Sequence, residues 1–433
     1  MKIAFFTDTF YPEVNGVAAS CLTLKRALEK RGHEVHVFAP RSRVKDAVQD
    51  PRVHLLPSMP FFLLKDRNVT FYSGNALRRM AAMGFDVVHT HSEFAAGILG
   101  LRVGLAGGAA LVHTYHTAWE DYTTYVSHGV KPVDKAVKGF SRKYSRWWCN
   151  RFDRVVTPTA KTRDLLIGYG ERTDIDIIPS GMDLGRFAPE RHPASEREAI
   201  RLECGVKPGE RVLLNIGRLA PEKNLSRLLR VFPDLLKVHP EVRFVIIGEG
   251  PSRKELAEEA GRLGVGNSVT LTGPKPWDDI DKYYAIGDVF ASCSHSETQG
   301  LTYIEAMASG LCVTAARDAC LDGVLEDGVN GLLAEDTKES LLAALCRAFG
   351  DEGEAIRTRA PESVRRYGTQ AFAEAIERCY EQAMLASARR EHSMVKASGK
   401  KLAAIYHSSS RAIHRSSAKW KKRYLHTRFR PKK

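Results

Sequence analysis

Short apolar runs alternate with amphipathic stretches along the first half of the chain. Residues 3–7 form an apolar run, and residues 18–31 carry leucines at helical spacing until Gly32. This alternation is typical of buried strands joined by helices. Further apolar runs of strand length follow at 35–39, 86–90, 110–114, 154–157 and 175–179.

A second series of the same kind follows a polar, proline-containing stretch that ends near Gly209. Its strands are expected at 211–216, 243–247, 268–271, 289–292 and 311–315, with a helix at 224–238. Strands that alternate with helices form parallel sheets covered on both faces, and ligands bind at the carboxyl ends of such strands. We therefore expect an α/β protein with two Rossmann-like, doubly wound domains that face a central cleft.

The same pattern predicts the domain boundaries. The first domain spans residues 1–182 and the second spans 183–364. A last helical pattern runs without a break over 361–384, and we assign its part at 365–384 to the first domain. Residues 385–433 form a tail.

Positive charge is concentrated in that tail. The 433 residues include 65 Lys and Arg against 51 Asp and Glu, a net charge of +14. Residues 385–433 hold 15 of the bases and one acid, so the other 384 residues, with 50 bases and 50 acids, are neutral. The basic character therefore belongs to the tail, which we expect either to associate with a membrane or to be disordered.

Composition narrows the class of protein. With 43% apolar and 27% charged residues, the chain is neither collagen-like, nor disordered throughout, nor a small disulfide scaffold. Its eight cysteines are scattered singly, which favours reduced thiols in the cytosol. The N-terminus turns polar too early for a signal peptide, and no apolar run is long enough to span a bilayer. We expect a cytoplasmic protein that is either soluble or bound to a surface, and the family resemblance described below implies peripheral attachment to the inner face of the cell membrane.

Residues 131–154 predict a basic amphipathic helix. This stretch contains eight Lys and Arg residues but only two acids, and aromatic residues recur at helical spacing. Apolar side chains ringed by Lys and Arg are typical of contact with an anionic membrane surface. The alternative is that the tryptophans pack in the core and the bases are solvated, whereas nucleic-acid binding is disfavoured because no reading motif is present. The residues expected to touch the membrane are Lys143, Arg146, Trp147 and Trp148.

The segment from Ser294 to Gly310 is the richest in candidate chemistry. Glu297 and Glu305 lie eight residues apart, with Gly300 and Leu301 between them. Gly300 and Leu301 are expected to open a helix whose free N–H groups can bind phosphate. Glu305 could then accept hydrogen bonds from sugar hydroxyls, and the alternative is a surface loop with two solvated acids.

Two further loops follow predicted first strands. Arg218 and Lys223 flank a short loop and could both face a pyrophosphate, because Arg donates a fixed pair of hydrogen bonds and Lys supplies a point charge. Asn15 and Gly16 allow the backbone to pass close to a ligand. That turn is not a GxGxxG, so a nicotinamide cofactor is not expected.

Metal sites are not favoured by the sequence. His89 and His91 alternate onto one face of a strand, but no third ligand follows at a defined spacing. The two DxD strings, at 174–176 and 279–281, fall in a predicted strand and at a helix start, so chance explains them best.

Together these segments resemble glycosyltransferase family 4, whose members have the GT-B fold with a nucleotide-sugar donor held between two Rossmann-like domains. The resemblance covers residues 1–384 and rests on Glu297-x7-Glu305 with Gly300-Leu301, and on Gly-Arg…Glu-Lys-Asn at 217–224. It implies transfer with retention of configuration and no metal or other cofactor bound by the protein. The implied roles are diphosphate binding by Gly16, Arg218, Lys223, Gly300 and Leu301, ribose binding by Glu305, contact with the transferred sugar by Glu297, and an active-site histidine at His116.

Within the family, the runs FFTDTFYPEVNGV, THSEF and HTYHTAWEDYTTYV resemble bacterial enzymes that glucosylate diacylglycerol from UDP-glucose. Those enzymes are monotopic and need anionic lipid, in agreement with the helix at 131–154. We therefore expect a retaining hexosyltransferase that moves glucose to a membrane lipid hydroxyl, with the acceptor entering near His116, Glu120 and Asp121. Either a covalent intermediate or attack on the face of departure would retain configuration, and we favour the second because Glu297 is better suited to orient hydroxyls.

Three other functions are compatible with these sequence features. A GDP-mannose-dependent α-mannosyltransferase acting on a phosphoinositide or another glycolipid would share the fold and the charges. A sugar-nucleotide epimerase would consume donor without an acceptor. A non-catalytic, membrane-bound nucleotide-sugar binder would not need Glu297, Arg218, Lys223 and His116 together.

Overall fold

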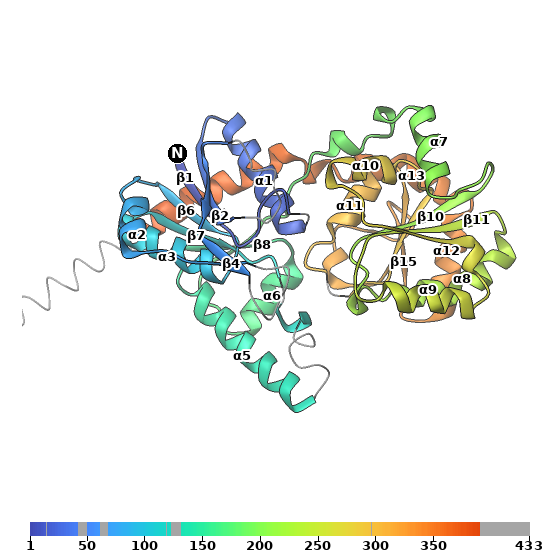
Figure 1. The fold of residues 1–433 in the computed structure, drawn as a ribbon, viewed down its shortest axis with the longest axis horizontal. Coiled ribbons are helices and arrows are strands. Elements are labelled where there is room, and N and C mark those ends of the chain that lie inside the picture. The colour runs from blue at the N-terminus through green and yellow to red at the C-terminus, as the bar shows by residue number, and fades with distance from the viewer. Residues whose placement is uncertain are drawn as a thin grey trace, which may run out of the picture.

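Two parallel β-sheets, each covered by helices on both faces, make up the computed structural model (Figure 1). It describes residues 1–13, 15–41, 50–60, 68–117, 119–122, 131–295 and 297–389. The expectation of two doubly wound α/β units is confirmed. Most of the tail predicted at 385–433 lies outside the described residues.

The first sheet has seven strands in the order β3-β2-β1-β6-β7-β8-β9, and all neighbours are parallel. Strand β3 and the short antiparallel pair β4–β5 were not expected from the sequence. The strands are β1 (Lys2–Phe6), β2 (Glu34–Pro40), β3 (Val53–Leu56), β4 (Ser58–Pro60), β5 (Asn68–Thr70), β6 (Val87–Thr90), β7 (Ala110–Thr114), β8 (Arg154–Thr157) and β9 (Ile175–Ile177). The helices are α1 (Gly16–Lys30), α2 (Gly74–Ala81), α3 (Ala95–Gly107), α5 (Lys131–Cys149) and α6 (Ala160–Gly168).

The second sheet has six strands in the order β12-β11-β10-β13-β14-β15, again all parallel. Its strands are β10 (Arg211–Ile216), β11 (Val242–Ile247), β12 (Val269–Gly273), β13 (Val289–Ser292), β14 (Cys312–Ala316) and β15 (Leu332–Ala334). Its helices are α7 (Ala194–Glu203), α8 (Leu225–Val238), α9 (Arg253–Arg262), α10 (Ile280–Tyr284), α11 (Leu301–Ala308), α12 (Lys338–Ala348) and α13 (Asp351–Ser363).

In both sheets the strand order reverses next to the first strand. In the first sheet the order reverses between β1 and β6, and in the second between β10 and β13. At such a switch point the loops leave in opposite directions and open a crevice at the carboxyl ends of the strands. The loops that carry Gly16, Lys223 and Glu297 follow β1, β10 and β13, whereas His116 follows β7, next to β6 in the first sheet.

The last helix starts later than the sequence predicts. Helix α13 ends at Ser363, a 3-10 turn spans Arg365–Tyr367, and a new helix runs over residues 369–389. The unbroken helix expected at 361–384 is therefore wrong at its start, and 385–389 belongs to the helix rather than to the tail. Phe372, Ile376 and Tyr380 of this helix are buried against the core of the first sheet, to which the chain returns (Figure 1).

Helix α5 extends away from the first sheet, at the lower edge of the domain in Figure 1. Its two neighbouring tryptophans have opposite environments. Trp147 is 46% exposed, whereas Trp148 is 0% exposed and packs on Phe152 and His113. Membrane contact by Trp148 is therefore wrong, because successive helical residues point about 100° apart and only one of the two faces outward. Lys143 and Arg146 are exposed.

Candidate active site between the two domains

The loops after the first strands of the two domains meet across the domain boundary. Asn15 caps α1 by accepting a hydrogen bond from the Ala18 amide at 3.0 Å, which fixes Gly16 as the first helical residue. A Cβ atom built on Gly16 would lie 3.7 Å from Cδ1 of Leu301, the first residue of α11. The helix starts of the two domains therefore face each other, as the predicted roles of Gly16 and Leu301 require.

Lys223 and Glu297 form an ion pair between Nζ and Oε1. Lys223 ends the 3-10 turn that follows β10, and Glu297 lies in the loop that follows β13. Their side chains are 24% and 19% exposed, so the pair is partly desolvated. Arg218 has an exposed side chain and follows β10 on the same loop as Lys223. The structure thus brings Lys223 to Glu297, whereas the side chain of Arg218, on the same loop, is exposed.

Gly300 gives α11 its start. Its φ of 70° lies in the left-handed region, and a Cβ there would come within 2.3 Å of Cδ2 of Tyr303. Only glycine fits this position without displacing the tyrosine ring. The first N–H groups of a helix lack intrahelical partners and attract anions. The helix predicted to open at Gly300 and Leu301 is confirmed.

Glu305 lies in the second turn of α11 and is only partly exposed. Its Oε2 accepts a hydrogen bond of 2.7 Å from the hydroxyl of Tyr284. Burial raises the pKa of Glu305 above its ordinary value, although Tyr284 and the more distant Arg186 oppose the shift. A half-buried carboxylate fixed in this way is suited to accept hydrogen bonds from hydroxyl groups.

His116 follows β7, on the side of the first domain. Its Nε2 lies 3.1 Å from Nδ1 of His91, which follows β6. Desolvation, with a smaller contribution from His113, lowers the pKa of His116 to about 3, so the ring is neutral near pH 7. A neutral imidazole can donate or accept a hydrogen bond beside a sugar without adding charge.

The loop that carries Glu297 is bound to the first domain at several points that the sequence did not reveal. Thr298 donates to the carbonyl of His116 at 2.9 Å, and Thr159 donates to the carbonyl of Thr298 at 2.8 Å. Gln299 exchanges two hydrogen bonds, of 2.8 and 2.9 Å, with the backbone of Ser180. These side chains were missed because each acts through a partner more than 100 residues away in the chain. The only local sign was their position next to strand ends.

Lys161 adds an ionic contact between the domains. Its Nζ lies 2.7 Å from Oδ1 of Asp318 and 3.1 and 3.4 Å from the carbonyl oxygens of His295 and Glu297. Lys161 belongs to α6 of the first domain, whereas Asp318 follows β14 of the second. The cation therefore contacts the loop before α11 at two backbone carbonyls, those of His295 and Glu297.

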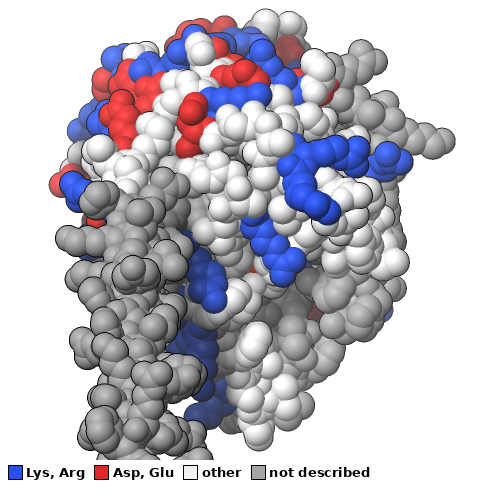
Figure 2. Space-filling model, turned by 90° about the vertical axis from the view of Figure 1, so that its left-hand side faces the viewer, with Lys and Arg blue, Asp and Glu red and all other residues white. Residues whose placement is uncertain are grey.

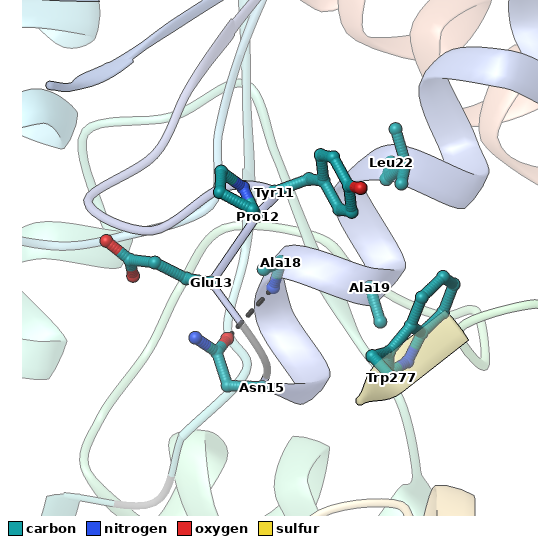
Figure 3. A pocket seen from close by; sticks show the side chains of 8 residues that line it. All are labelled: Tyr11, Pro12, Glu13, Asn15, Ala18, Ala19, Leu22 and Trp277. Carbon is teal, nitrogen blue, oxygen red and sulfur yellow. Dashed lines mark hydrogen bonds between the residues drawn. The ribbon is translucent and has the colours of Figure 1, made fainter. Parts of the chain in front are cut away.

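A pocket opens beside these loops, on the face of α1 (Figure 3). Tyr11 and Pro12 of the first domain and Trp277 of the second line it together with Ala18 and Ala19 of α1, and the Asn15–Ala18 cap lies at its edge. Trp277 is positioned by Arg186, whose guanidinium lies 4.4 Å from the ring centroid. The sequence did not single out Trp277, whose place depends on packing between the domains.

The residues expected on the acceptor side are only partly described. Glu120 lies in the 3-10 turn Trp119–Tyr122 and accepts two hydrogen bonds from Arg142 of α5. It therefore joins α5 to the loop that follows His116. The side chain of Asp121 lies outside the described part of the structure.

The histidines and DxD strings have structural partners. His89 is 0% exposed and bonds to Tyr380 and Thr114. Asp174 and Asp176 both accept hydrogen bonds from Arg154, and Asp281 accepts two from Arg186. Within the described ranges, no group of three or more His, Cys, Asp or Glu is placed to hold a metal ion.

Solved structures define the class of fold. The chain superposes on HepE from Anabaena, solved in complex with UDP and glucose, with a TM-score of 0.69 at 18% identity over 88% of this chain and 99% of that chain. Sucrose-phosphate synthase from Thermosynechococcus elongatus gives a TM-score of 0.69 at 19% identity over 89% of this chain and 99% of that chain. Two doubly wound domains with loops meeting at their switch points are thus the GT-B fold of glycosyltransferases.

Sequence comparison then identifies the family. A family model described as Glycosyltransferase Family 4 matches residues 14–186, and one described as Glycosyl transferases group 1 matches residues 196–385. The chain belongs to glycosyltransferase family 4.

Curated relatives include two proteins named alpha-monoglucosyldiacylglycerol synthase. The chain is 35% identical to the alpha-monoglucosyldiacylglycerol synthase of Streptococcus pneumoniae over 80% of this chain and 78% of the relative. It is 32% identical to the enzyme of that name from Acholeplasma laidlawii over 78% and 86%, respectively. The GDP-mannose-dependent alpha-mannosyltransferase of Mycobacterium tuberculosis is 29% identical over 73% and 79%.

Proposed function

We propose that this glycosyltransferase moves glucose from UDP-glucose to the hydroxyl of diacylglycerol, with retention of configuration, at the cytosolic face of a membrane. The observation that carries the proposal is the Lys223–Glu297 pair beside the start of α11, in a chain 35% identical to a monoglucosyldiacylglycerol synthase. The pair offers a cation for a diphosphate and a carboxylate for sugar hydroxyls at one place.

The mechanism follows from charge. When the bond to the sugar breaks, negative charge grows on the departing diphosphate. Lys223, Arg218 and the N–H groups at Leu301 would bind that charge more strongly as it develops, which lowers the barrier. Glu297 and the neutral His116 would orient the sugar, and Glu305 the ribose. We favour acceptor attack on the face of departure, without a covalent intermediate and without a protein-bound metal or other cofactor.

A lipid acceptor is supported by the outer side of α5. Val133, Phe140 and Trp147 are 43%, 68% and 46% exposed and recur every seven residues, so they form one apolar stripe along the helix. Lys143 and Arg146 are exposed beside it. An exposed apolar stripe with flanking bases is typical of helices that lie in the headgroup region of anionic membranes.

The charge distribution on the surface of the first domain is also relevant to membrane attachment. Seen from the end of the molecule where α2 and α3 lie, acidic side chains gather near the top, interspersed with Lys and Arg, and further Lys and Arg side chains are scattered over a largely uncharged surface below (Figure 2). No described helix is long and apolar enough to cross a bilayer. We propose peripheral attachment, with α5 entering the interface and the basic tail adding attraction to anionic lipid.

Product analysis tests the proposal. The full chain is incubated with UDP-glucose or GDP-mannose in mixed micelles of anionic lipid, with and without diacylglycerol, and the lipid product and its anomeric configuration are determined. We expect α-glucosyldiacylglycerol from UDP-glucose only when diacylglycerol is present. Transfer from GDP-mannose to a phosphoinositide would favour the mannosyltransferase, to which the relative from Mycobacterium tuberculosis points. Donor binding without any product would favour a non-catalytic binder.

A further inference from the structure

We infer that Lys161 is a positioning residue, which holds the loop with Glu297 in its working place only when the two domains are closed on each other. The inference rests on the proposed function and concerns the same site. Lys161 belongs to the first domain, but all of its described polar partners belong to the second. It was not among the candidate residues from the sequence.

The ammonium group of Lys161 has three partners, as many as its N–H donors. Its Nζ approaches the carbonyl oxygen of His295 at 3.1 Å, that of Glu297 at 3.4 Å, and the Asp318 carboxylate at 2.7 and 3.0 Å. An ammonium has three N–H donors and no acceptor, so these three partners match its number of donors. Lys161 therefore fixes two backbone positions of the loop, one of them at Glu297 itself.

The rest of the loop depends on the same part of the first domain. Thr159 caps α6 and donates to the carbonyl of Thr298 at 2.8 Å. Thr298 in turn donates to the carbonyl of His116. The start of α6 and the backbone at His116 thus determine the path of the loop between Glu297 and Gly300. Separation of the domains would break all of these contacts together.

Two lysines from different domains consequently act on Glu297. Lys223 pairs with its carboxylate from within the second domain, and Lys161 binds its backbone carbonyl from the first. Asp318 anchors Lys161. The side chain of Asp318 is only 9% exposed, and its Oδ1 also accepts a hydrogen bond from the Cys320 amide. Because Asp318 and Lys223 both lie in the second domain, Lys161 is the first-domain residue that contacts the backbone of Glu297 itself, whereas the Thr159, His116 and Ser180 contacts hold the residues after it. Binding of the donor to the second domain alone does not need the Lys161 contact.

The test compares Lys161→Met with Lys338→Met. Lys338 is the matched control, since it pairs with Asp234 at 2.6 Å inside the second domain. We expect Lys161→Met to lower kcat by about 10-fold or more, on the scale of small displacements of reacting groups, while UDP-glucose binding in calorimetry stays as in the wild type. Lys338→Met should change neither. An unchanged kcat in Lys161→Met overturns the inference, as does a loss confined to donor affinity.

Hydrogen exchange supplies a second readout that needs no substrate. In the full-length protein, amides at 297–300 should exchange about 10- to 100-fold faster in Lys161→Met, the range expected when a hydrogen bond to a charged group is lost. Wild-type protection in this segment overturns the inference even if the protein proves to use another donor or acceptor. Failure of the wild type to form glycolipid, by contrast, overturns only the proposed function.

A double variant guards against misfolding. Removing Lys161 alone leaves the Asp318 carboxylate in a site that is 9% exposed, which can destabilise the fold. Lys161→Met combined with Asp318→Asn removes both charges and keeps an acceptor for the Cys320 amide. We expect this variant to unfold at the wild-type temperature and still to show lower kcat and faster exchange at 297–300. Wild-type values of both quantities would overturn the inference.

Discussion

Lys223 and Glu297 are joined by an ion pair although 74 residues separate them in the chain. One follows the first strand of the second sheet and the other follows its neighbour β13 across the switch point. Both side chains are about one-fifth exposed, so the pair is shielded but accessible to a ligand. A bound diphosphate would compete with Glu297 for Lys223, which frees the carboxylate for sugar hydroxyls as the donor arrives.

Removing this cation should affect catalysis more than folding. We expect Lys223→Ala to lower kcat/KM by about 100-fold or more, the scale of losing one group that stabilises charge in the transition state. The measurement is the initial rate of glycolipid formation, with Lys338→Ala as the control for loss of a lysine elsewhere. A wild-type rate in Lys223→Ala would exclude this residue from the site.

The two tryptophans of α5 should behave in opposite ways. Trp147→Ala should weaken sedimentation with anionic vesicles at an unchanged melting temperature, because the ring is 46% exposed. Trp148→Ala should cost about 3–5 kcal/mol of unfolding free energy, because it empties a fully buried volume. Vesicle binding and thermal unfolding are measured on both variants. Equal vesicle binding by Trp147→Ala and the wild type would contradict the membrane role of α5.

The basic tail should contribute electrostatic attraction to the membrane. Deletion is best made at residues 390–433, which carry 14 bases and one acid, because the last described helix continues to residue 389. We expect weaker binding to anionic liposomes and a smaller loss of binding when salt is added. Activity on micelles without net charge serves as the control and should persist. Identical liposome binding would show that the tail has another task.

Glu305 should trade stability for donor binding. Its pKa is raised in the folded protein, mainly by burial, so ionisation costs folding free energy as pH rises through the folded-state pKa. Glu305→Gln removes this cost and keeps an acceptor for Tyr284. The variant should therefore melt at a higher temperature than the wild type at pH 7, with a difference that disappears as pH falls toward the ordinary carboxyl pKa of about 4.3. Its affinity for UDP-glucose should fall, and a lower melting temperature at pH 7 would contradict the assignment.

Metal removal should leave the enzyme active. The proposed mechanism neutralises the diphosphate with Lys223, Arg218 and the helix start at Leu301, without a metal held by protein ligands. We expect dialysis against a chelator, followed by assay in metal-free buffer, to leave kcat largely unchanged. Loss of activity that is restored by one divalent cation would contradict this part of the mechanism.

Much of the site was predictable because its residues follow strand ends. Apolar runs locate the strands, and in a parallel sheet the loops after the strands lie at one edge, so Gly16, Lys223, Glu297 and Gly300 could be expected near one another. Their identities then suggest the chemistry: a point charge, a carboxylate and a helix start. The roles of all these residues, and of Arg218, Leu301, Glu305 and His116, stay predictions, since the structure gives their places and not their ligands.

Other features could not be predicted for physical reasons. The polar and apolar pattern over 361–384 concealed the break between Ser363 and the helix at 369–389, because the chain is helical on both sides of the break. The second helix packs on the core of the first sheet, which the pattern does not record. Neither the burial of Trp148 nor the outward direction of Trp147 follows from sequence, since both are apolar and adjacent.

The sequence by itself determined the succession of strands and helices, the two-domain fold and the loops that carry the chemistry, because these depend on periodicity and on residue types within a few positions. Tertiary structure alone decided which partners those residues meet. The contacts of Lys161 with Asp318, of Thr298 with His116 and of Gln299 with Ser180 each join two domains. Such contacts depend on how two separately encoded surfaces pack, and no local pattern records that packing.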